Sequence, residues 1–189
     1  MSTSTKQTRN LAYIAILSAI SFLLMYVQFP LIPAANFLQI DFSVLPVLLA
    51  LVIFDLKSAF AVLAIRTILK LLLNNGGAGT LIGMPMNFIA LSVFLLSLAL
   101  IWNKKRTSKN FILASIVGTL SLTLVMFVLN YVYAVPLYAK FANFDISAFI
   151  GLGKYLFAMV IPFNLLEGLI FAVAFIALYG ALKPVLKKI

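Results

Sequence analysis

The sequence KYLFAMVIPFNLLEGLIFAVAFIALYGAL, residues 154–182, is the most informative apolar run of this chain. It is long and apolar, yet it carries Asn164 and Glu167 near its middle. Residues three positions apart lie on the same face of a helix, so both side chains are expected to point to one side. A carboxylate at bilayer depth costs about 2.5–3.5 kcal/mol on insertion scales, and such a residue rarely faces lipid. We therefore expect this pair to face a partner, a cavity or a ligand.

The whole chain shares this apolar character. Of its 189 residues, 65% are hydrophobic, and the mean hydropathy is +1.18, whereas a soluble domain is about 45–50% apolar. The apolar runs are continuous and do not alternate with period two, which favours a helical bundle over a barrel. The first run is as long as a span and lacks a small-residue cleavage site, so we expect it to remain uncleaved. The sequence predicts an all-α, multi-pass integral membrane protein of the cell membrane.

Six spans are predicted, over residues 11–29, 42–54, 59–73, 81–102, 111–136 and 154–182. The basic residues other than Arg66 and Lys70, which lie inside the third span, are divided unevenly between the two sides. Ten lie on one side, namely Lys6, Arg9, Lys57, Lys104, Lys105, Arg106, Lys109, Lys183, Lys187 and Lys188, and two, Lys140 and Lys154, lie on the other. Because cytoplasmic loops carry the excess of Lys and Arg, both termini are predicted to be cytoplasmic, and residues 1–189 form one transmembrane domain.

Several function classes are disfavoured by composition. The formal net charge of +10 is interpreted as a topology signal and as contacts with lipid headgroups, because no module for reading or stacking bases is visible. The chain has no Cys and no His, which removes the usual zinc ligands, thiol nucleophiles and the commonest general base. We therefore expect no metal site, no cofactor and no enzymatic activity.

The unusual polar features gather in the outer half of the predicted bundle. The loop of residues 30–41 is apolar enough to fold back as a lid, and residues 74–80 and 137–153 form the other outer loops. Residues 83–87 contain Gly83 and Pro85, which predict a broken start of the fourth span. Amides and hydroxyls with Phe, Met and Tyr walls predict an outward-facing cavity for an uncharged, flat ligand with carbonyls, imides or hydroxyls.

Two basic residues, Arg66 and Lys70, interrupt the third run. Lys70 is expected to extend toward the headgroups, whereas Arg66 lies deeper and is expected to pair, with Asp41 or Glu167 as candidates. The chain has no nucleotide-binding motif and no ladder of acids for ion coupling, so active import would require a separate motor.

The sequence resembles the substrate-binding S components of energy-coupling factor (ECF) transporters, and among these it resembles the riboflavin-specific S components. The resemblance rests on six short spans, on Ala15-x-x-x-Ala19, on Gln39-Ile40-Asp41-Phe42-Ser43-Val44-Leu45-Pro46, on Gly83-x-Pro85-x-Asn87 and on Asn164-x-x-Glu167. It implies a subunit that binds riboflavin from outside and associates with a transmembrane coupling protein and two ATP-binding cassette ATPases, which drive uptake. Riboflavin is then the transported ligand and not a cofactor.

The resemblance also implies which residues bind. The implied vitamin contacts are Leu38, Gln39, Asp41, Gly79, Thr80, Met84, Asn87, Asn130, Lys154, Asn164 and Glu167, and the implied docking face for the coupling protein contains Ala15 and Ala19. Three alternatives stay open at this stage: an S component for thiamine or biotin, a membrane-embedded enzyme acting on lipid, and a passive channel.

Overall fold

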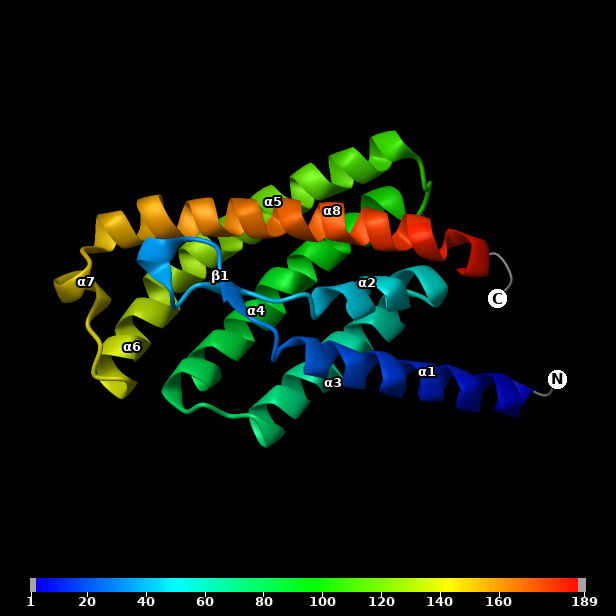
Figure 1. The fold of residues 1–189 in the computed structure, drawn as a ribbon, viewed down its shortest axis with the longest axis horizontal. Helices are drawn as coiled ribbons and strands as arrows, with labels where there is room; N and C mark the ends of the chain where they lie inside the picture. The colour runs from blue at the N-terminus through cyan, green and yellow to red at the C-terminus, as the bar shows by residue number, and fades with distance from the viewer. Residues whose placement is uncertain (1–2, 187–189) are drawn as a thin grey trace.

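The computed structural model describes residues 3–186, and this part of the chain is almost entirely helical (Figure 1). The long helices are α1 (Thr3–Leu24), α3 (Leu56–Leu73), α4 (Ala78–Ser97), α5 (Ser108–Leu129) and α8 (Ile161–Leu186). The short helices are α2 (Val44–Ile53), α6 (Val135–Phe141) and α7 (Ile146–Phe149). The segment between α1 and α2 contains β1 (Phe29–Pro30), the 3₁₀ turn η1 (Pro33–Ala35) and β2 (Gln39–Ile40), with β1 and β2 paired antiparallel.

The described part of the chain also contains three π-helical turns. The turn η2 (Leu98–Trp102) continues α4, η3 (Asn130–Ala134) joins α5 to α6, and η4 (Lys154–Val160) leads into α8. The long helices lie roughly along one axis, α1 begins and α8 ends at the same end of the bundle, and α6 and α7 form the other end (Figure 1). Helix α5 packs against α4 and α8, and α1 packs against α2 and α3.

Within residues 3–186, four helical segments are long and apolar enough to cross a membrane, namely Gln7–Leu24, Ala78–Trp102, Ser108–Phe141 and Lys154–Pro184. They correspond to four of the six predicted spans, and the helical membrane class is confirmed. The other two predicted spans are helices of a different kind. Helix α2 has ten residues, which is about 15 Å at helical rise, and α3 contains Arg66 and Lys70.

The predicted loop over residues 74–80 is shorter than expected, because α4 already begins at Ala78. Gly77 has φ of 84°, a left-handed conformation that glycine adopts without cost. Its N–H donates to Asn75 Oδ1 (2.9 Å), and the Gly76 N–H donates to Thr80 Oγ1 (3.0 Å). The broken start of the fourth span was also a wrong prediction. Helix α4 continues through Pro85, which removes one helical hydrogen bond while tertiary packing holds the helix.

The predicted loop over residues 137–153 is largely helical instead. Pro136 stands in the first turn of α6, where its missing N–H costs little, so the chain continues as a helix to Phe141. Asp145 then caps α7 by accepting from the backbone N–H groups of Ser147 and Ala148. A proline near the end of an apolar run therefore did not mark the end of the helix here.

The core is apolar and includes an aromatic cluster at the end of the bundle that holds the termini. Trp102 packs edge-on against Phe111, Phe175 and Tyr179. Near the middle of the bundle, α5 and α8 approach closely at Gly168. A Cβ placed on Gly168 would lie 2.5 Å from Thr119 Oγ1, so only glycine allows this spacing between the helices.

The close approach yields a stability prediction. Gly168→Ala is expected to lower stability by about 1–3 kcal/mol, because the added methyl group overlaps the Thr119 side chain. Gly180→Ala in the same helix is the matched control, because a Cβ there meets no atom within 4 Å. Heat denaturation of the purified variants in detergent measures both. Equal melting temperatures for the two variants would contradict the tight contact.

Candidate ligand-binding site

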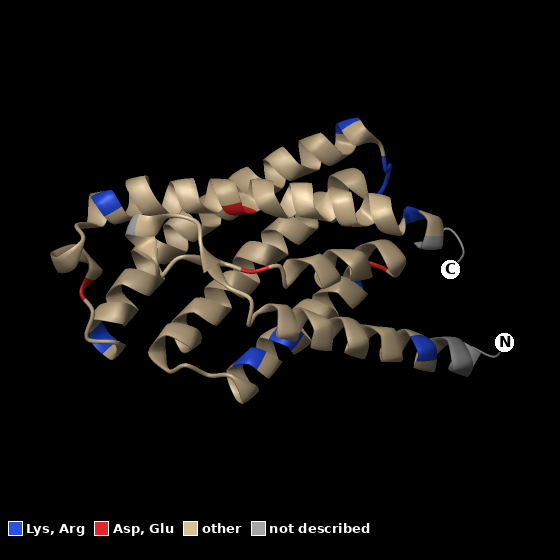
Figure 2. Cartoon of the chain, viewed as in Figure 1, with Lys and Arg blue, Asp and Glu red and all other residues tan. Residues whose placement is uncertain are grey.

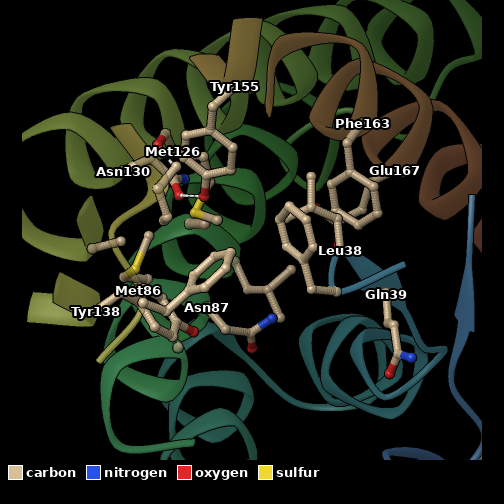
Figure 3. A pocket seen from close by; sticks show the side chains of 17 residues that line it. Leu38, Gln39, Met86, Asn87, Met126, Asn130, Tyr138, Tyr155, Phe163 and Glu167 are labelled. Carbon is tan, nitrogen blue, oxygen red and sulfur yellow. Dashed lines mark hydrogen bonds between the residues drawn. The ribbon is translucent and has the colours of Figure 1, made fainter. Parts of the chain in front are cut away.

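A cavity of about 330 Å³ lies among the β1–β2 segment, α4, α5, η3, α6, the segment that contains α7, η4 and α8 (Figure 3). It is lined by Phe37, Leu38, Gln39, Gly83, Met86, Asn87, Ala90, Leu91, Met126, Asn130, Ala134, Tyr138, Phe144, Ile146, Tyr155, Phe163 and Glu167. Its volume lies within the range of about 300–1,000 Å³ that is typical of small-molecule sites. Aromatic and methionine side chains with a few polar groups are the usual lining of such sites.

Among the amides of this lining, Asn130 is bonded to protein groups at both ends of its side chain. Its side chain is 4% exposed, its Nδ2 donates to the Met126 carbonyl (2.7 Å), and its Oδ1 accepts from the Tyr155 hydroxyl (2.5 Å). Figure 3 shows the bond between Asn130 and Tyr155 at one side of the cavity. These two bonds hold the amide in one orientation, and the second N–H of Nδ2 is left for a ligand.

Both residues of this pair lie in π-helical turns, Asn130 at the start of η3 and Tyr155 in η4. A π turn adds one residue to the helical repeat, and such turns occur frequently at functional sites. The extra residue changes which side chains face inward. In η4 the residue that lines the cavity is Tyr155, and the neighbouring Lys154 is exposed.

A buried cation lies beside the cavity. Arg66 is fully buried, its guanidinium donates to Ser43 Oγ and to Asn87 Oδ1, and its Nε has no partner in the described part of the chain. The expected ion pair with Asp41 or Glu167 is not formed among residues 3–186, because the guanidinium nitrogens reach Ser43 and Asn87 instead.

Five of the eleven sequence-predicted contact residues line the cavity together, namely Leu38, Gln39, Asn87, Asn130 and Glu167. The remaining six, which are Asp41, Gly79, Thr80, Met84, Lys154 and Asn164, do not belong to its lining. Asp41 accepts from the Ser43 backbone N–H (2.7 Å). Met84 is buried. Gly79 and Thr80 lie in the first turn of α4.

Asn164 is buried next to the lining residue Phe163 and not in the lining itself. Its Nδ2 donates to the Val160 carbonyl (2.7 Å), and its Oδ1 has no partner in the part of the chain that the structure describes. The shared helical face of Asn164 and Glu167 therefore does not bring both residues into the cavity.

Comparison with known proteins identifies the family. Residues 9–179 match the family described as "ECF transporter, substrate-specific component". The chain belongs to the substrate-specific components of ECF transporters. It is thus a transport subunit of the cell membrane and not an enzyme.

Individual relatives agree with this assignment to the S components. The Streptococcus thermophilus protein "Riboflavin transporter RibU" is 69% identical over 96% of this chain and 86% of that protein. "Riboflavin transporter FmnP" of Bacillus subtilis is 32% identical over 94% of each. The solved structure titled "Structure and mechanism of the S component of a bacterial ECF transporter" superposes with a TM-score of 0.79 at 32% identity, over 96% of this chain and 99% of that chain.

Most of the cavity wall of this S component was not singled out residue by residue from the sequence. The lining residues that were not predicted as contacts are Phe37, Gly83, Met86, Ala90, Leu91, Met126, Ala134, Tyr138, Phe144, Ile146, Tyr155 and Phe163. Gly83 was expected only as part of a break at the start of the fourth span. Their types are those expected for the walls, but a sequence with seventeen Phe residues gives no sign of which ones face inward. Tyr155 had one usable signal, because it follows Lys154 at the start of a span.

Proposed function

We propose that this chain is the riboflavin-binding subunit of an ATP-driven ECF transporter for vitamin uptake. The observation that carries the proposal is the cavity, which combines three amide side chains, Gln39, Asn87 and Asn130, with aromatic and methionine walls. An isoalloxazine ring is flat and has an imide edge, and the ribityl chain supplies hydroxyls. Amides can both donate to and accept from such groups, so no charged clamp is needed. The riboflavin transporters among its relatives support the same ligand.

In this proposal the chain is one transmembrane domain with six spans and both termini in the cytoplasm. Lys140 lies in the last turn of α6 and Lys154 begins η4, at the end of the bundle that carries α6 and α7. Arg9 lies in the first half of α1 and Lys183 in the last turn of α8, toward the end that holds the termini, and Figure 2 shows Lys and Arg at both ends of the bundle. The positive-inside rule then places the end with α6 and α7 outside. Riboflavin would enter from that side, past the β1–β2 segment, which contributes Leu38 and Gln39 to the lining.

The proposed partners are a transmembrane coupling protein and two ATP-binding cassette ATPases. Ala15 and Ala19 are exposed on α1, four residues apart. Small residues at this spacing let a second helix approach closely in a membrane. The exposed apolar side chains elsewhere on the long helices, such as Leu72 and Leu124, are in contact with lipid in this proposal. No nucleic acid partner is proposed.

The test is purification of the chain from cells, followed by equilibrium titration with riboflavin. Flavin absorbs visible light, so bound vitamin is detected directly in the purified protein. Competition with thiamine and biotin distinguishes riboflavin binding from that of another vitamin on the same scaffold. We expect riboflavin to bind and the other two vitamins not to displace it. Displacement by thiamine or biotin, or the absence of any riboflavin binding, would overturn the proposed ligand.

A further inference from the structure

Asn87 of α4 is held by a group that can only donate hydrogen bonds. The Arg66 guanidinium donates to Asn87 Oδ1, and an arginine side chain has five N–H donors and no acceptor. The atom of the amide that faces Arg66 must therefore be the oxygen. Rotation of the amide by 180° would place its NH₂ group against the guanidinium, with two donors facing each other and no acceptor between them.

The amide nitrogen of Asn87 is consequently directed away from Arg66. Asn87 lines the cavity (Figure 3), and in the described part of the chain its Nδ2 has no protein partner. The amide of Asn130 differs, because both of its ends are already bonded to protein groups. Asn87 thus presents its NH₂ group to the cavity as a donor, and Arg66, which lies outside the cavity lining, sets the direction of that group.

The position of Arg66 is itself fixed by neighbouring elements. Its guanidinium also donates to Ser43 Oγ, and the Ser43 carbonyl accepts from Ser21 Oγ of α1 (2.5 Å). The charge is retained because arginine does not lose its proton in proteins. The group that orients Asn87 is therefore permanently a donor.

We propose that Arg66 is a positioning residue that fixes Asn87 as a hydrogen-bond donor to the bound ligand, so that the cavity selects a ligand with an acceptor at this point. This inference rests on the proposed riboflavin binding and makes it more specific. The acceptor is a ring carbonyl oxygen or an unprotonated ring nitrogen, and a group that can only donate is rejected there. Arg66 acts through Asn87 and does not itself line the cavity.

The decisive variant is Asn87→Asp. A carboxylate keeps an oxygen against Arg66 and gains a charge attraction, but it presents only acceptors to the cavity. We expect the variant to be at least as stable as the parent protein and to bind riboflavin more weakly by on the order of ten- to hundredfold, because two acceptors then face each other. Unchanged affinity in the folded variant would show that the bond to Arg66 is purely structural and would overturn the inference.

A matched control exists outside the cavity. Asn74 Oδ1 also accepts from a cation, Lys70 Nζ (2.6 Å), and Asn74 does not line the cavity. Asn74→Asp makes the same chemical change, so it should leave riboflavin affinity unaltered. Failure of the parent protein to bind riboflavin would reject the proposed function, whereas binding by the parent with unchanged binding by Asn87→Asp rejects only the role of Arg66.

A second measurement does not depend on the folding of Asn87→Asp. Flavins whose ring acceptors are altered one at a time, with N5 replaced by CH or a carbonyl oxygen replaced by sulfur, are titrated into the parent protein and into Asn87→Ala. We expect one of these changes to weaken binding to the parent by about tenfold and to have no effect in Asn87→Ala. If every altered flavin binds the parent as well as riboflavin does, the cavity has no acceptor requirement and the inference is wrong.

Discussion

Ala19→Trp is expected to reduce riboflavin uptake by on the order of ten- to hundredfold while leaving riboflavin binding intact. Ala15 and Ala19 are both exposed on α1, outside the cavity lining. Close contact between membrane helices depends on small side chains, because lipid offers no hydrophobic drive for association. An indole at Ala19 would hold the coupling protein away from α1.

Three measurements test this expectation. Uptake of labelled riboflavin is followed in cells that contain the coupling protein and the ATPases, assembly is followed by co-purification, and binding is followed by titration of the isolated chain. Leu120→Trp is the control, because Leu120 is 57% exposed on α5, a helix well separated from α1 in Figure 1. Normal uptake by Ala19→Trp would exclude this face of α1 from docking.

Asn130→Leu is expected to weaken riboflavin binding by about 1–3 kcal/mol, on the order of ten- to hundredfold. The variant removes an amide from the cavity wall and leaves the buried Tyr155 hydroxyl without its acceptor. A buried polar group without a partner is costly, so stability should fall as well. Titration in detergent and heat denaturation measure the two effects.

Tyr155→Phe separates the two contributions within this pair. It removes the hydroxyl that holds Asn130 Oδ1 but leaves the amide in the cavity, so it should weaken binding less than Asn130→Leu does. Tyr131→Phe, at a neighbouring residue that is 55% exposed, should leave both binding and stability unchanged. Equal affinity of Asn130→Leu and the parent protein would remove Asn130 from the binding site.

The helical membrane class could be predicted from the sequence because hydrophobic run length is a strong signal. Lys57, Arg66 and Lys70 place three charges in the eighteen residues of α3, so it does not qualify as a span by composition although it is a regular helix. Loop boundaries were less predictable. Gly76, Gly77 and Pro136 suggested longer loops. Instead, the N–H groups of Gly76 and Gly77 bond to side chains near the start of α4, and Pro136 lies in the first turn of α6.

The site was predicted in outline but not in detail. Two polar residues of the cavity, Asn130 and Glu167, could be found because Asn and Glu are rare in the middle of apolar helices. The partners of Arg66 could not be found, since choosing Ser43 and Asn87 over two acids requires three-dimensional positions. The π turns at Asn130 and Tyr155 have no clear signal in the sequence. The sequence therefore does not indicate which of the neighbouring residues face the cavity.

Whether riboflavin occupies this cavity can be tested by cysteine protection. The chain has no Cys, so single cysteines can be introduced without background labelling. Gly83 lines the cavity and has no atom within 4 Å of an added Cβ, and Lys140 is exposed and lies outside the lining. Saturating riboflavin should protect Gly83→Cys, but not Lys140→Cys, from a soluble maleimide. Equal labelling of Gly83→Cys with and without bound riboflavin would show that riboflavin does not bind in this cavity.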